Sequence, residues 1–264
     1  MKIFRLLIFF VIFVSFIEKS HAIDEILIAY SGKLNGEGRR GAQLGLEEAN
    51  TQGKFLNLAF QLIDNPSDLQ GRVLGGFKAV VSDSGSRDLR LLTSSYNPIP
   101  IFNIAERSEA LRQECYENLL HVISSEEMLD DAITQWQRGR VRLRQTATGW
   151  HYSFKKYAAA QLNKRYEEKY NEPMSEVAWA GWASIKIISD TIARFPDSGD
   201  LLYSMKTNLK FDGQKGVSMT FRENGQLRQP VLIIEQDRVI GEMPQPGANF
   251  QNRLDDLGTV DCYK

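Results

Sequence analysis

The stretch EILIAYSGKLNGEGRRGAQLGLEEAN, residues 25–50, decides the fold class of this chain. It begins with a short apolar run of β-forming residues, continues through a glycine-rich loop and ends with apolar residues at helical spacing. The following stretches repeat this order, and strands that alternate with helices predict a parallel sheet with helices on both faces. Further strands are predicted at 58–66, 78–86 and 99–106, and further helices at 68–77 and 86–97.

Three polar loops follow the first, third and fourth predicted strands: SGKLNGEG, SDSGSRD and NIAERSE. In open parallel sheets, ligands bind outside the carboxyl ends of the strands, which is where these loops lie. None of them contains the GxGxxG pattern of dinucleotide sites, and GKLNGEG lacks the G-K-[ST] ending of a nucleotide phosphate loop. Their serine and asparagine side chains suit either a ligand or the capping of the next helix.

The second half of the chain is predicted to be richer in helices. Ser124 or Ser125 is a candidate N-cap for the first of them, because acidic residues follow in the first turn. Near the C-terminus, two strands are predicted on either side of an Asn224-Gly225 turn. The predicted helices of this half lie at 124–137, 150–171, 175–195 and 200–208.

The N-terminal stretch MKIFRLLIFFVIFVSFIEKSHA, residues 1–22, is typical of a secretory signal peptide. Basic residues precede an apolar run of about 12 residues, which is shorter than the roughly 20 residues that span a bilayer. Ser20-His21-Ala22 then provides small residues for cleavage. We expect a mature chain that begins near Ile23 and is exported to the periplasm, with an uncleaved membrane anchor as the alternative.

The formal net charge of the chain is −1, which argues against a general binder of nucleic acid or another polyanion. One segment, RGRVRLR, is nevertheless basic, because every second residue is an arginine. In a strand, Arg138, Arg140, Arg142 and Arg144 would share one face. We interpret this segment as a solvated connection or an edge strand, with an anion-binding role as the alternative.

Cysteine and histidine usage limits the chemistry of the chain. Cys115 and Cys262 form an even pair in an exported protein, which predicts one disulfide, with two free thiols as the alternative. His121 and His151 lack neighbours in a metal-ligand pattern. No Ser–His–Asp set, Cys–His set or G-x-S-x-G motif is legible. We therefore predict no catalytic residue, no metal, no cofactor and no enzymatic activity.

Several longer segments carry a resemblance to a known family. The signal peptide, the strand that ends in SG, RRGAQLGLEEAN and FDGQKGVSMTFRENGQLRQPVLII resemble periplasmic solute-binding proteins of ABC transporters, of the type I branched-chain amino-acid (leucine-binding) class. LLHVISSEEMLDDAITQW, QLNKRYEEKYNEPMSEVAWAGWASIKII and NRLDDLGTVDC resemble the subfamily associated with pyrroloquinoline quinone (PQQ)-dependent alcohol dehydrogenase systems. Together these segments cover most of the mature chain.

The resemblance implies a type I periplasmic binding-protein fold and a small polar ligand that undergoes no covalent chemistry. The ligand would be an amino acid, PQQ or a related small acid, and an ABC permease in the inner membrane would receive it. By position, the resemblance places ligand contacts on the three loops of the first lobe and on one segment of the second. These residues are Ser31, Gly32, Ser82, Ser84, Asn103, Ala105, Thr148 and Trp150.

One departure from the family pattern is large. Members usually have two α/β lobes, whereas this chain passes directly through the arginine segment and has roughly 100 residues fewer than two lobes need. The alternative function is therefore a single-lobe protein-interaction or degenerate module associated with a periplasmic PQQ-dependent dehydrogenase. We expect a doubly wound first lobe at 23–122 and 172–210, and a truncated second lobe with the C-terminal hairpin and tail at 123–171 and 211–264.

Overall fold

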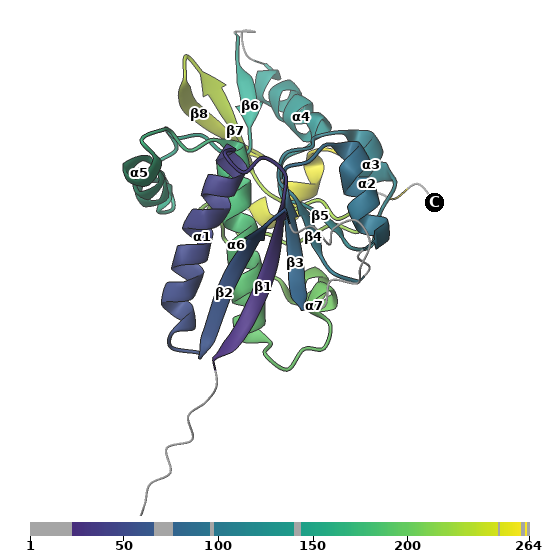
Figure 1. Ribbon diagram of the computed structural model, residues 1–264. Helices are drawn as coiled ribbons and strands as arrows, with labels where there is room; N and C mark the ends of the chain where they lie inside the picture. The colour runs from purple at the N-terminus through teal and green to yellow at the C-terminus, as the bar shows by residue number, and fades with distance from the viewer. Residues whose placement is uncertain are drawn as a thin grey trace, which may run out of the picture.

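A parallel sheet of five strands forms the centre of the chain (Figure 1). The computed structural model describes residues 23–65, 76–95, 98–139, 144–247, 249–259 and 262. The strands are β1 (Asp24–Ser31), β2 (Leu58–Asp64), β3 (Phe77–Ser82), β4 (Ile101–Asn103) and β5 (Leu119–His121). Their order is β2-β1-β3-β4-β5, so the direction of winding reverses between β1 and β3. The predicted doubly wound α/β class is therefore confirmed.

Helices cover both faces of this sheet, because its central strands are apolar on both sides. These helices are α1 (Glu37–Gly53), α2 (Ser86–Ser95), α3 (Glu109–Gln113) and α6 (Glu176–Arg194). Ile28 and Tyr30 of β1 belong to the buried cluster that includes residues of α1 and α6. Ala29, which points the other way, belongs to the cluster that includes residues of α2 and α3.

The helices α1 and α6 approach each other backbone to backbone. A Cβ on Gly41 would lie 1.8 Å from the carbonyl oxygen of Ala178, and a Cβ on Gly181 would lie 2.2 Å from the carbonyl oxygen of Gly38. Glycine is required at such contacts because it has no side chain. This packing places the start of α6 beside the start of α1, at the carboxyl ends of the strands.

A second, antiparallel sheet lies beyond the carboxyl ends of the central strands (Figure 1). It consists of β6 (Thr146–Thr148), β7 (Val231–Glu235) and β8 (Arg238–Met243), in the order β6-β7-β8. Ile233 and Met243 on one face pack against α4 (Glu126–Gln137). The N-cap of α4 is Ser125, whose side chain accepts a hydrogen bond from the N–H of Met128, so one of the two predicted caps is confirmed.

The hairpin of this sheet turns at a different place from the one predicted. β7 and β8 are joined at Gln236 and Asp237, whose φ angles of 47° and 61° are the left-handed values that a two-residue hairpin turn requires. The predicted turn at Asn224-Gly225 is present, but it is flanked by a single antiparallel bridge between Phe221 and Leu227 and does not join the strands of the second sheet. The turn at Gln236-Asp237 is not predicted from the sequence because Gln-Asp is a weaker turn signal than Asn-Gly.

The segment around Gly225 covers the edge of β5. The N–H of His121 donates to the carbonyl oxygen of Gly225 at 2.8 Å, and the N–H of Leu227 donates to the carbonyl oxygen of His121 at 2.9 Å. The edge strand of the central sheet is therefore paired rather than open. Neither β5 nor α3 is predicted from the sequence, because elements of three to five residues are too short to show periodicity.

The helix predicted at 150–171 begins later than expected. The structure places α5 at Ala159–Tyr170. Tyr157 and Ala158 have φ angles of 52° and 67°, which a right-handed helix does not accommodate. The stretch before them forms turns instead, and it carries Trp150 into the interior, where the side chain is 1% exposed.

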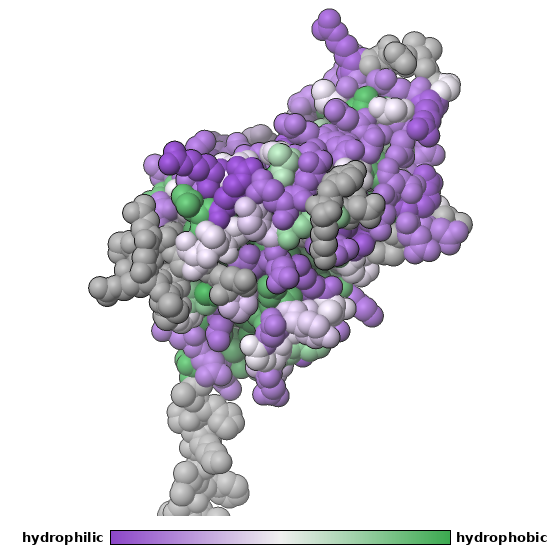
Figure 2. Space-filling view, turned by 90° about the vertical axis from the view of Figure 1, so that its right-hand side faces the viewer, coloured by the Kyte–Doolittle hydropathy of each residue, from purple (hydrophilic) through white to green (hydrophobic). Residues whose placement is uncertain are grey.

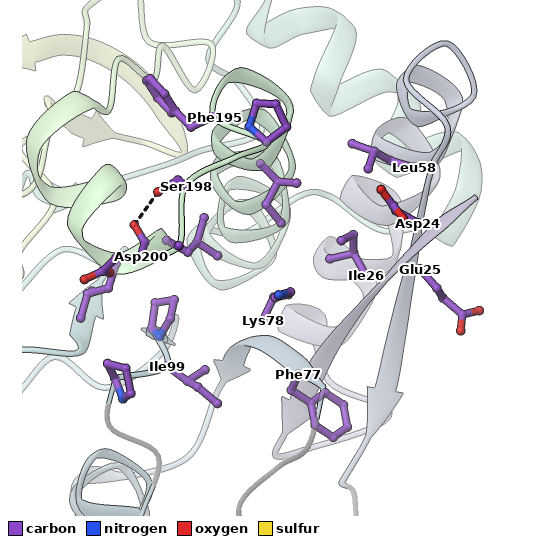
Figure 3. A pocket seen from close by; sticks show the side chains of 17 residues that line it. Asp24, Glu25, Ile26, Leu58, Phe77, Lys78, Ile99, Phe195, Ser198 and Asp200 are labelled. Carbon is purple, nitrogen blue, oxygen red and sulfur yellow. Dashed lines mark hydrogen bonds between the residues drawn. The ribbon is translucent and has the colours of Figure 1, made fainter. Parts of the chain in front are cut away.

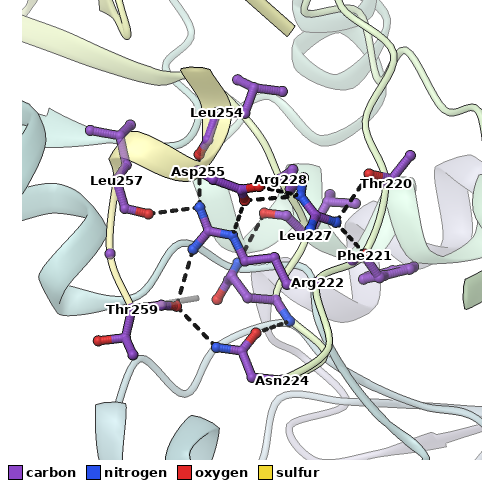
Figure 4. A network of polar contacts seen from close by, with 12 residues as sticks. Thr220, Phe221, Arg222, Asn224, Leu227, Arg228, Leu254, Asp255, Leu257 and Thr259 are labelled. Carbon is purple, nitrogen blue, oxygen red and sulfur yellow. Dashed lines mark hydrogen bonds and ion pairs between the residues drawn. The ribbon is translucent and has the colours of Figure 1, made fainter. Parts of the chain in front are cut away.

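Arg222 binds the C-terminal segment at residues 254–257 (Figure 4). Its buried guanidinium donates to the carbonyl oxygens of Leu254 and Leu257, both at 2.7 Å, and pairs with Asp255 at 2.9 Å. These partners lie in or just after η2, a 3-10 helix at Phe250–Asp256. A guanidinium can satisfy several acceptors at once because its donors form a fixed planar fork.

The predicted disulfide between Cys115 and Cys262 is confirmed. It joins the end of the chain to the loop that follows α3, across a sequence separation of 147 residues. Together with the contacts of Arg222, the disulfide holds the C-terminal segment at two points.

Some expectations concern residues outside the described part of the chain. The predicted signal peptide at 1–22 lies there, as do most of the helix predicted at 68–77 and the two central arginines of the basic segment. Arg138 and Arg144, at the ends of that segment, are exposed and lie outside the strands. Within the described residues, no helix is both long enough and apolar enough to cross a membrane.

Candidate functional site

Three of the predicted ligand residues form a row across the carboxyl end of the central sheet. Ser31 pairs with Ser82, and Ser82 pairs with Asn103, in the registers of β1 with β3 and of β3 with β4. The structure therefore brings the predicted first-lobe residues together at one edge, as parallel strands require. The other three follow within two residues of these strand ends: Gly32, Ser84 and Ala105.

Gly32 occupies a position that only glycine fits. Its φ angle is 142°, and a Cβ would lie 1.6 Å from Asp83 Oδ1. The N–H of Gly32 donates to Asn65 Oδ1 at 2.8 Å, and Asn65 Nδ2 donates to the carbonyl oxygen of Gly32 at 3.0 Å. Asp83 Oδ1 accepts from the N–H of Lys33 at 2.8 Å. The backbone donors of Gly32 and Lys33 are therefore already paired within the chain.

Asn103 and Ser82 are completely buried and organise the loops that they begin. Asn103 Nδ2 donates to the carbonyl oxygen of Glu106 at 2.7 Å, and Asn103 Oδ1 accepts from the N–H of Glu106 at 2.8 Å. Ser82 Oγ accepts from the N–H of Ser84 at 3.2 Å. Side chains of this kind commonly hold a turn by bonding the backbone two or three residues ahead.

Glu106 places a carboxylate between two of these loops. Its Oε2 accepts from the N–H of Ser86, the first residue of α2, at 3.0 Å, and its Oε1 accepts from the N–H of Ser108 at 2.9 Å. Burial raises the pKa of Glu106, but the hydrogen bonds from Ser108 and Ser86 outweigh burial and leave the pKa below its ordinary value. The N-terminus of α2, where an anion binds readily, therefore holds a carboxylate of the chain itself.

A cleft of about 500 Å³ lies between the second sheet and the starts of α1 and α6. Two of the predicted ligand residues, Thr148 and Trp150, line it. The six predicted residues at the edge of the central sheet do not line it. Tyr152, Asp237 and Glu37 contribute to its walls. The cleft thus combines an apolar and aromatic wall with polar groups, as sites for small molecules do.

Trp150 forms a rigid wall of the cleft. Its ring stacks on the ring of Trp179, with centroids 5.6 Å apart and an interplanar angle of 12°. Its Nε1 donates to Asn163 Oδ1 at 2.9 Å, so the buried indole is fixed in position and orientation. Tyr152, two positions further on, is 40% exposed and donates its hydroxyl hydrogen to Asp237. The aromatic side of the cleft therefore has a buried part and an accessible part.

Glu176 is the buried carboxylate of the cleft and joins several segments of the chain. It pairs with Arg107 Nη2 at 2.7 Å, and it accepts from the N–H of Ser124 at 2.9 Å and from Thr148 Oγ1 at 2.8 Å. Burial raises its pKa, but Arg107 and the hydrogen bonds outweigh burial and lower the pKa to about 2. Glu176 is therefore ionised at neutral pH, and its charge is neutralised by Arg107.

Lys215 is a second buried charge, close to where the two sheets meet. Its Nζ lies 3.9 Å from the ring centroid of Trp179. The same Nζ donates to Gln229 Oε1 at 2.5 Å and to the carbonyl oxygen of Pro230 at 3.3 Å. Burial lowers the pKa of Lys215 from 10.5 to about 7, because the charged form loses its hydration.

We expect Lys215→Met to flatten the dependence of stability on pH. Between pH 7 and 10.5, unfolding of the wild type takes up a proton at Lys215, so the free energy of unfolding rises with pH by up to about 1.4 kcal/mol per unit. Denaturant unfolding at several pH values in this window measures the slope. Lys54→Met, at an exposed position, should keep the wild-type slope. An equal slope in both variants would contradict the expectation.

A second cavity, of about 550 Å³, opens at the amino-terminal end of the central sheet (Figure 3). Its walls include Ile26, Phe77 and Phe195, and part of α7 (Leu201–Asn208). The side chain of Lys78 lies among these walls. Because ligands of open parallel sheets bind at the carboxyl ends of the strands, this cavity is not the candidate site.

The structure adds charged residues that the sequence did not single out. Glu176 follows Ser175, the N-cap of α6, where an acidic residue is an ordinary partner of the helix dipole. Asp237 could not be identified from the sequence, because the turn that carries it was not predicted. The loop NIAERSE did contain a signal, since Glu106 and Arg107 are adjacent opposite charges in a loop expected at the carboxyl edge.

No protein-family model matches this chain, and no curated protein is similar to it in sequence. Solved structures do match. One is a branched-chain amino acid ABC transporter periplasmic ligand-binding protein from Burkholderia xenovorans, with 10% identity and a TM-score of 0.68 over 86% of this chain and 93% of that chain. A leucine-binding protein from Thermotoga maritima has 11% identity and a TM-score of 0.61 over 81% and 97%. A branched-chain amino acid transporter substrate-binding protein from Streptococcus pneumoniae, in complex with isoleucine, has 11% identity and a TM-score of 0.66 over 83% and 99%.

The chain therefore has the fold of type I periplasmic binding proteins. Its structural neighbours are periplasmic binding proteins of branched-chain amino acid ABC transporters, so the fold implied by the sequence resemblance is confirmed. Identities of 10–11% show a shared fold and no more. Ligand and partners have to be argued from the residues of this chain.

Proposed function

We propose that this chain is the solute-binding component of an ABC importer and takes a small organic ligand in the periplasm. The observation that carries the proposal is the cleft of about 500 Å³ between the second sheet and the starts of α1 and α6. A partly enclosed cleft with aromatic walls and a few polar groups is the usual form of a small-molecule site. The fold supports the proposal, because proteins described as periplasmic ligand-binding components of ABC transporters share it.

The chemistry of the cleft favours recognition over catalysis. Its buried carboxylate, Glu176, is paired with Arg107 and has a pKa of about 2, which is far from the value that suits proton transfer at neutral pH. The proposed export to the periplasm is supported by the N-terminal stretch at 1–22. The proposed permease partner is supported by the ABC transporter descriptions of the structural neighbours.

We propose that α4 and the three-stranded sheet belong to a reduced second lobe. One face of the sheet shares an apolar cluster with α4, whereas Leu232 and Ile234 on the other face of β7 join the cluster that includes α1 and α6. The proposed division keeps 23–122 and 172–210 in the first lobe, and 123–171 and 211–264 in the second. A small second lobe covers less of a ligand than a full lobe does, so we expect moderate affinity.

The PQQ ligand and the dehydrogenase partner have less support. PQQ would present carboxylates to the cleft, whereas the described residues that line the cleft include no lysine or arginine, and the nearby Arg107 is already paired with Glu176. Arg138 and Arg144 are exposed at the ends of the basic segment and do not line the cleft. A dehydrogenase partner rests on the sequence resemblance alone.

Thermal denaturation of residues 23–264 with a panel of ligands tests the proposed function. The panel contains neutral amino acids, aliphatic amines, small carboxylic acids and PQQ. A ligand that binds only the folded chain stabilises it by RT ln(1 + [L]/Kd), about 2.7 kcal/mol at one hundred times Kd. We expect a saturable rise in the melting temperature with one chemical class and none with the others.

Two tyrosine variants provide a matched control for this experiment. Tyr152→Leu removes an accessible ring from the cleft and should weaken the shift. Tyr203→Leu removes an even more exposed ring, 63% accessible, from α7 at the other end of the molecule and should leave the shift unchanged. A cooperatively folded sample that responds to no member of the panel would refute the proposal.

A second candidate, a protein-interaction module, is favoured by exposed apolar surface. On the face shown in Figure 2, hydrophobic surface gathers in the lower half, whereas the upper half is mostly hydrophilic. Ile23 and Phe55, at the amino-terminal end of the central sheet, are 67% and 87% exposed. Light scattering after size-exclusion chromatography distinguishes the two functions. An oligomer that dissociates in Phe55→Ser would favour the interaction module, and a monomer that responds to a ligand would favour the binder.

A further inference from the structure

The carboxyl edge of the central sheet is already supplied with carboxylates of the chain itself. Asp83 accepts from the N–H of Lys33, and Glu106 accepts from the N–H groups of Ser86 and Ser108. Backbone donors in such loops and at the start of a helix are where an anionic ligand is ordinarily held. An incoming carboxylate would have to displace one that is built in, so this edge is poorly suited to an anion.

The cleft carries negative charge on both of its sides, the side of α1 and the side of the second sheet. Glu37 comes from the start of α1, and Asp237 comes from the turn between β7 and β8. Of the described residues that line the cleft, His151 is the one basic side chain, and its Nε2 lies 3.2 Å from Asp237 Oδ1. Arg107, behind the lining, is paired with Glu176 and leaves Glu37 and Asp237 uncompensated by it. Hydrogen bonds from Tyr152 and His151 lower the pKa of Asp237, so this carboxylate stays ionised at neutral pH.

Aromatic rings stand beside these carboxylates. Trp150, His151 and Tyr152 are consecutive, and all three line the cleft. The ring centroids of His151 and Tyr152 are 4.5 Å apart, and Tyr152 is 40% exposed. The face of an aromatic ring attracts a cation, and a carboxylate at its edge adds to that attraction. Asp237 is 72% exposed at its side chain, so its oxygens can accept further hydrogen bonds.

We infer that the ligand of this cleft is an organic cation without a carboxylate, such as an aliphatic amine or a quaternary ammonium compound. Its charged group lies against the ring of Tyr152 and beside Asp237, and its apolar part lies towards Trp150. This inference rests on the proposed function, because it names the class of ligand for the same cleft. It departs from the neutral amino acid and from PQQ, both of which bring carboxylates.

Isothermal titration of residues 23–264 tests the inference with probes matched in shape and different in charge. The probes are choline, its uncharged isostere 3,3-dimethyl-1-butanol, putrescine, leucine and PQQ. We expect choline or putrescine to bind, and the isostere, leucine and PQQ to bind at least tenfold more weakly. Asp237→Asn should weaken binding of the cation roughly tenfold. Asp197→Asn, at an exposed position outside the cleft, should leave binding unchanged.

The outcomes separate this inference from the proposed function. Binding of a cation that is weakened in Asp237→Asn and unchanged in Asp197→Asn supports both. Binding of leucine, PQQ or the uncharged isostere in preference to the cations leaves the solute-binding function in place and overturns the inference. Equal binding of a cation by both variants also overturns it, because the site would then lie elsewhere. Failure of every probe, from folded protein, overturns the inference, and the wider ligand panel of the thermal-denaturation experiment then decides the proposed function separately.

Discussion

Replacing Glu176 by glutamine is expected to lower the free energy of unfolding by about 3–5 kcal/mol. The carboxylate is buried and is bound by the guanidinium of Arg107, by the N–H of Ser124 and by the hydroxyl of Thr148. Glutamine has one acceptor oxygen, so at least one of these donors loses its partner and the charge of Arg107 remains unpaired. Denaturant unfolding followed by tryptophan fluorescence measures the change.

The effect of Glu176→Gln should depend on pH. The pKa of Glu176 is about 2 in the folded chain and 4.5 as its ordinary value. A carboxyl whose pKa is lower in the folded state contributes stability above the unfolded pKa and loses it as the pH falls towards the folded pKa. The difference between wild type and Glu176→Gln should therefore be largest at neutral pH and shrink between about pH 5 and pH 2.

Two further variants control this experiment. Glu167→Gln changes an exposed carboxylate on α5 and should alter stability by less than about 0.5 kcal/mol. Arg107→Met combined with Glu176→Gln removes both charges and should cost less than the sum of the two single substitutions. A loss of less than about 1 kcal/mol in Glu176→Gln would show that the buried pair does not hold these segments together.

Removal of the disulfide is expected to lower the free energy of unfolding by about 2–4 kcal/mol. The bond between Cys115 and Cys262 closes a loop with a sequence separation of 147 residues, so it restricts the unfolded chain strongly. Replacing both cysteines by serine avoids a free thiol. Because Arg222 still binds Asp255 and the carbonyl oxygens of η2, the folded structure should remain, with an unchanged far-ultraviolet circular dichroism spectrum.

The same experiment on reduced wild type provides the control. A reductant should lower the stability of the wild type towards that of the double serine variant and should leave the variant itself unchanged. If the double variant is as stable as the oxidised wild type, the disulfide does not contribute to the stability of the folded chain. If it fails to fold, the C-terminal segment depends on the disulfide more than the contacts of Arg222 suggest.

The central sheet could be predicted from the sequence because its signal is local and periodic. The run EILIAY followed by a glycine-rich loop and an amphipathic helix repeats with strands long enough to recognise. The short β5 was not predicted because its three residues show no period by themselves, whereas β4, of the same length, was recognised from the longer apolar run IPIFNI around it. The helix predicted from residue 150 was wrong at its start, because Tyr157 and Ala158 have positive φ angles, and Trp150 stacks on Trp179 instead.

The candidate site could be predicted only in part. Loops that follow parallel strands meet at one edge, so the row of Ser31, Ser82 and Asn103 follows from topology. What the side chains do there does not follow, because it depends on contacts distant in sequence. Glu106 bonds Ser86 across 20 positions, and Glu176 bonds Arg107 across 69. The negative charge of the cleft also depends on such a contact, because Arg107 neutralises Glu176 and leaves the charges of Glu37 and Asp237.

The pairing of His121 with Gly225 and Leu227 has a consequence for synthesis of the chain. A ribosome releases the five strands of the central sheet long before it releases the segment that covers β5. During that interval the edge of β5 is open to pairing with another chain. The segment around Gly225 therefore protects the edge of a sheet whose five strands are synthesised earlier, and a nascent chain without this segment presents a surface that a chaperone can bind.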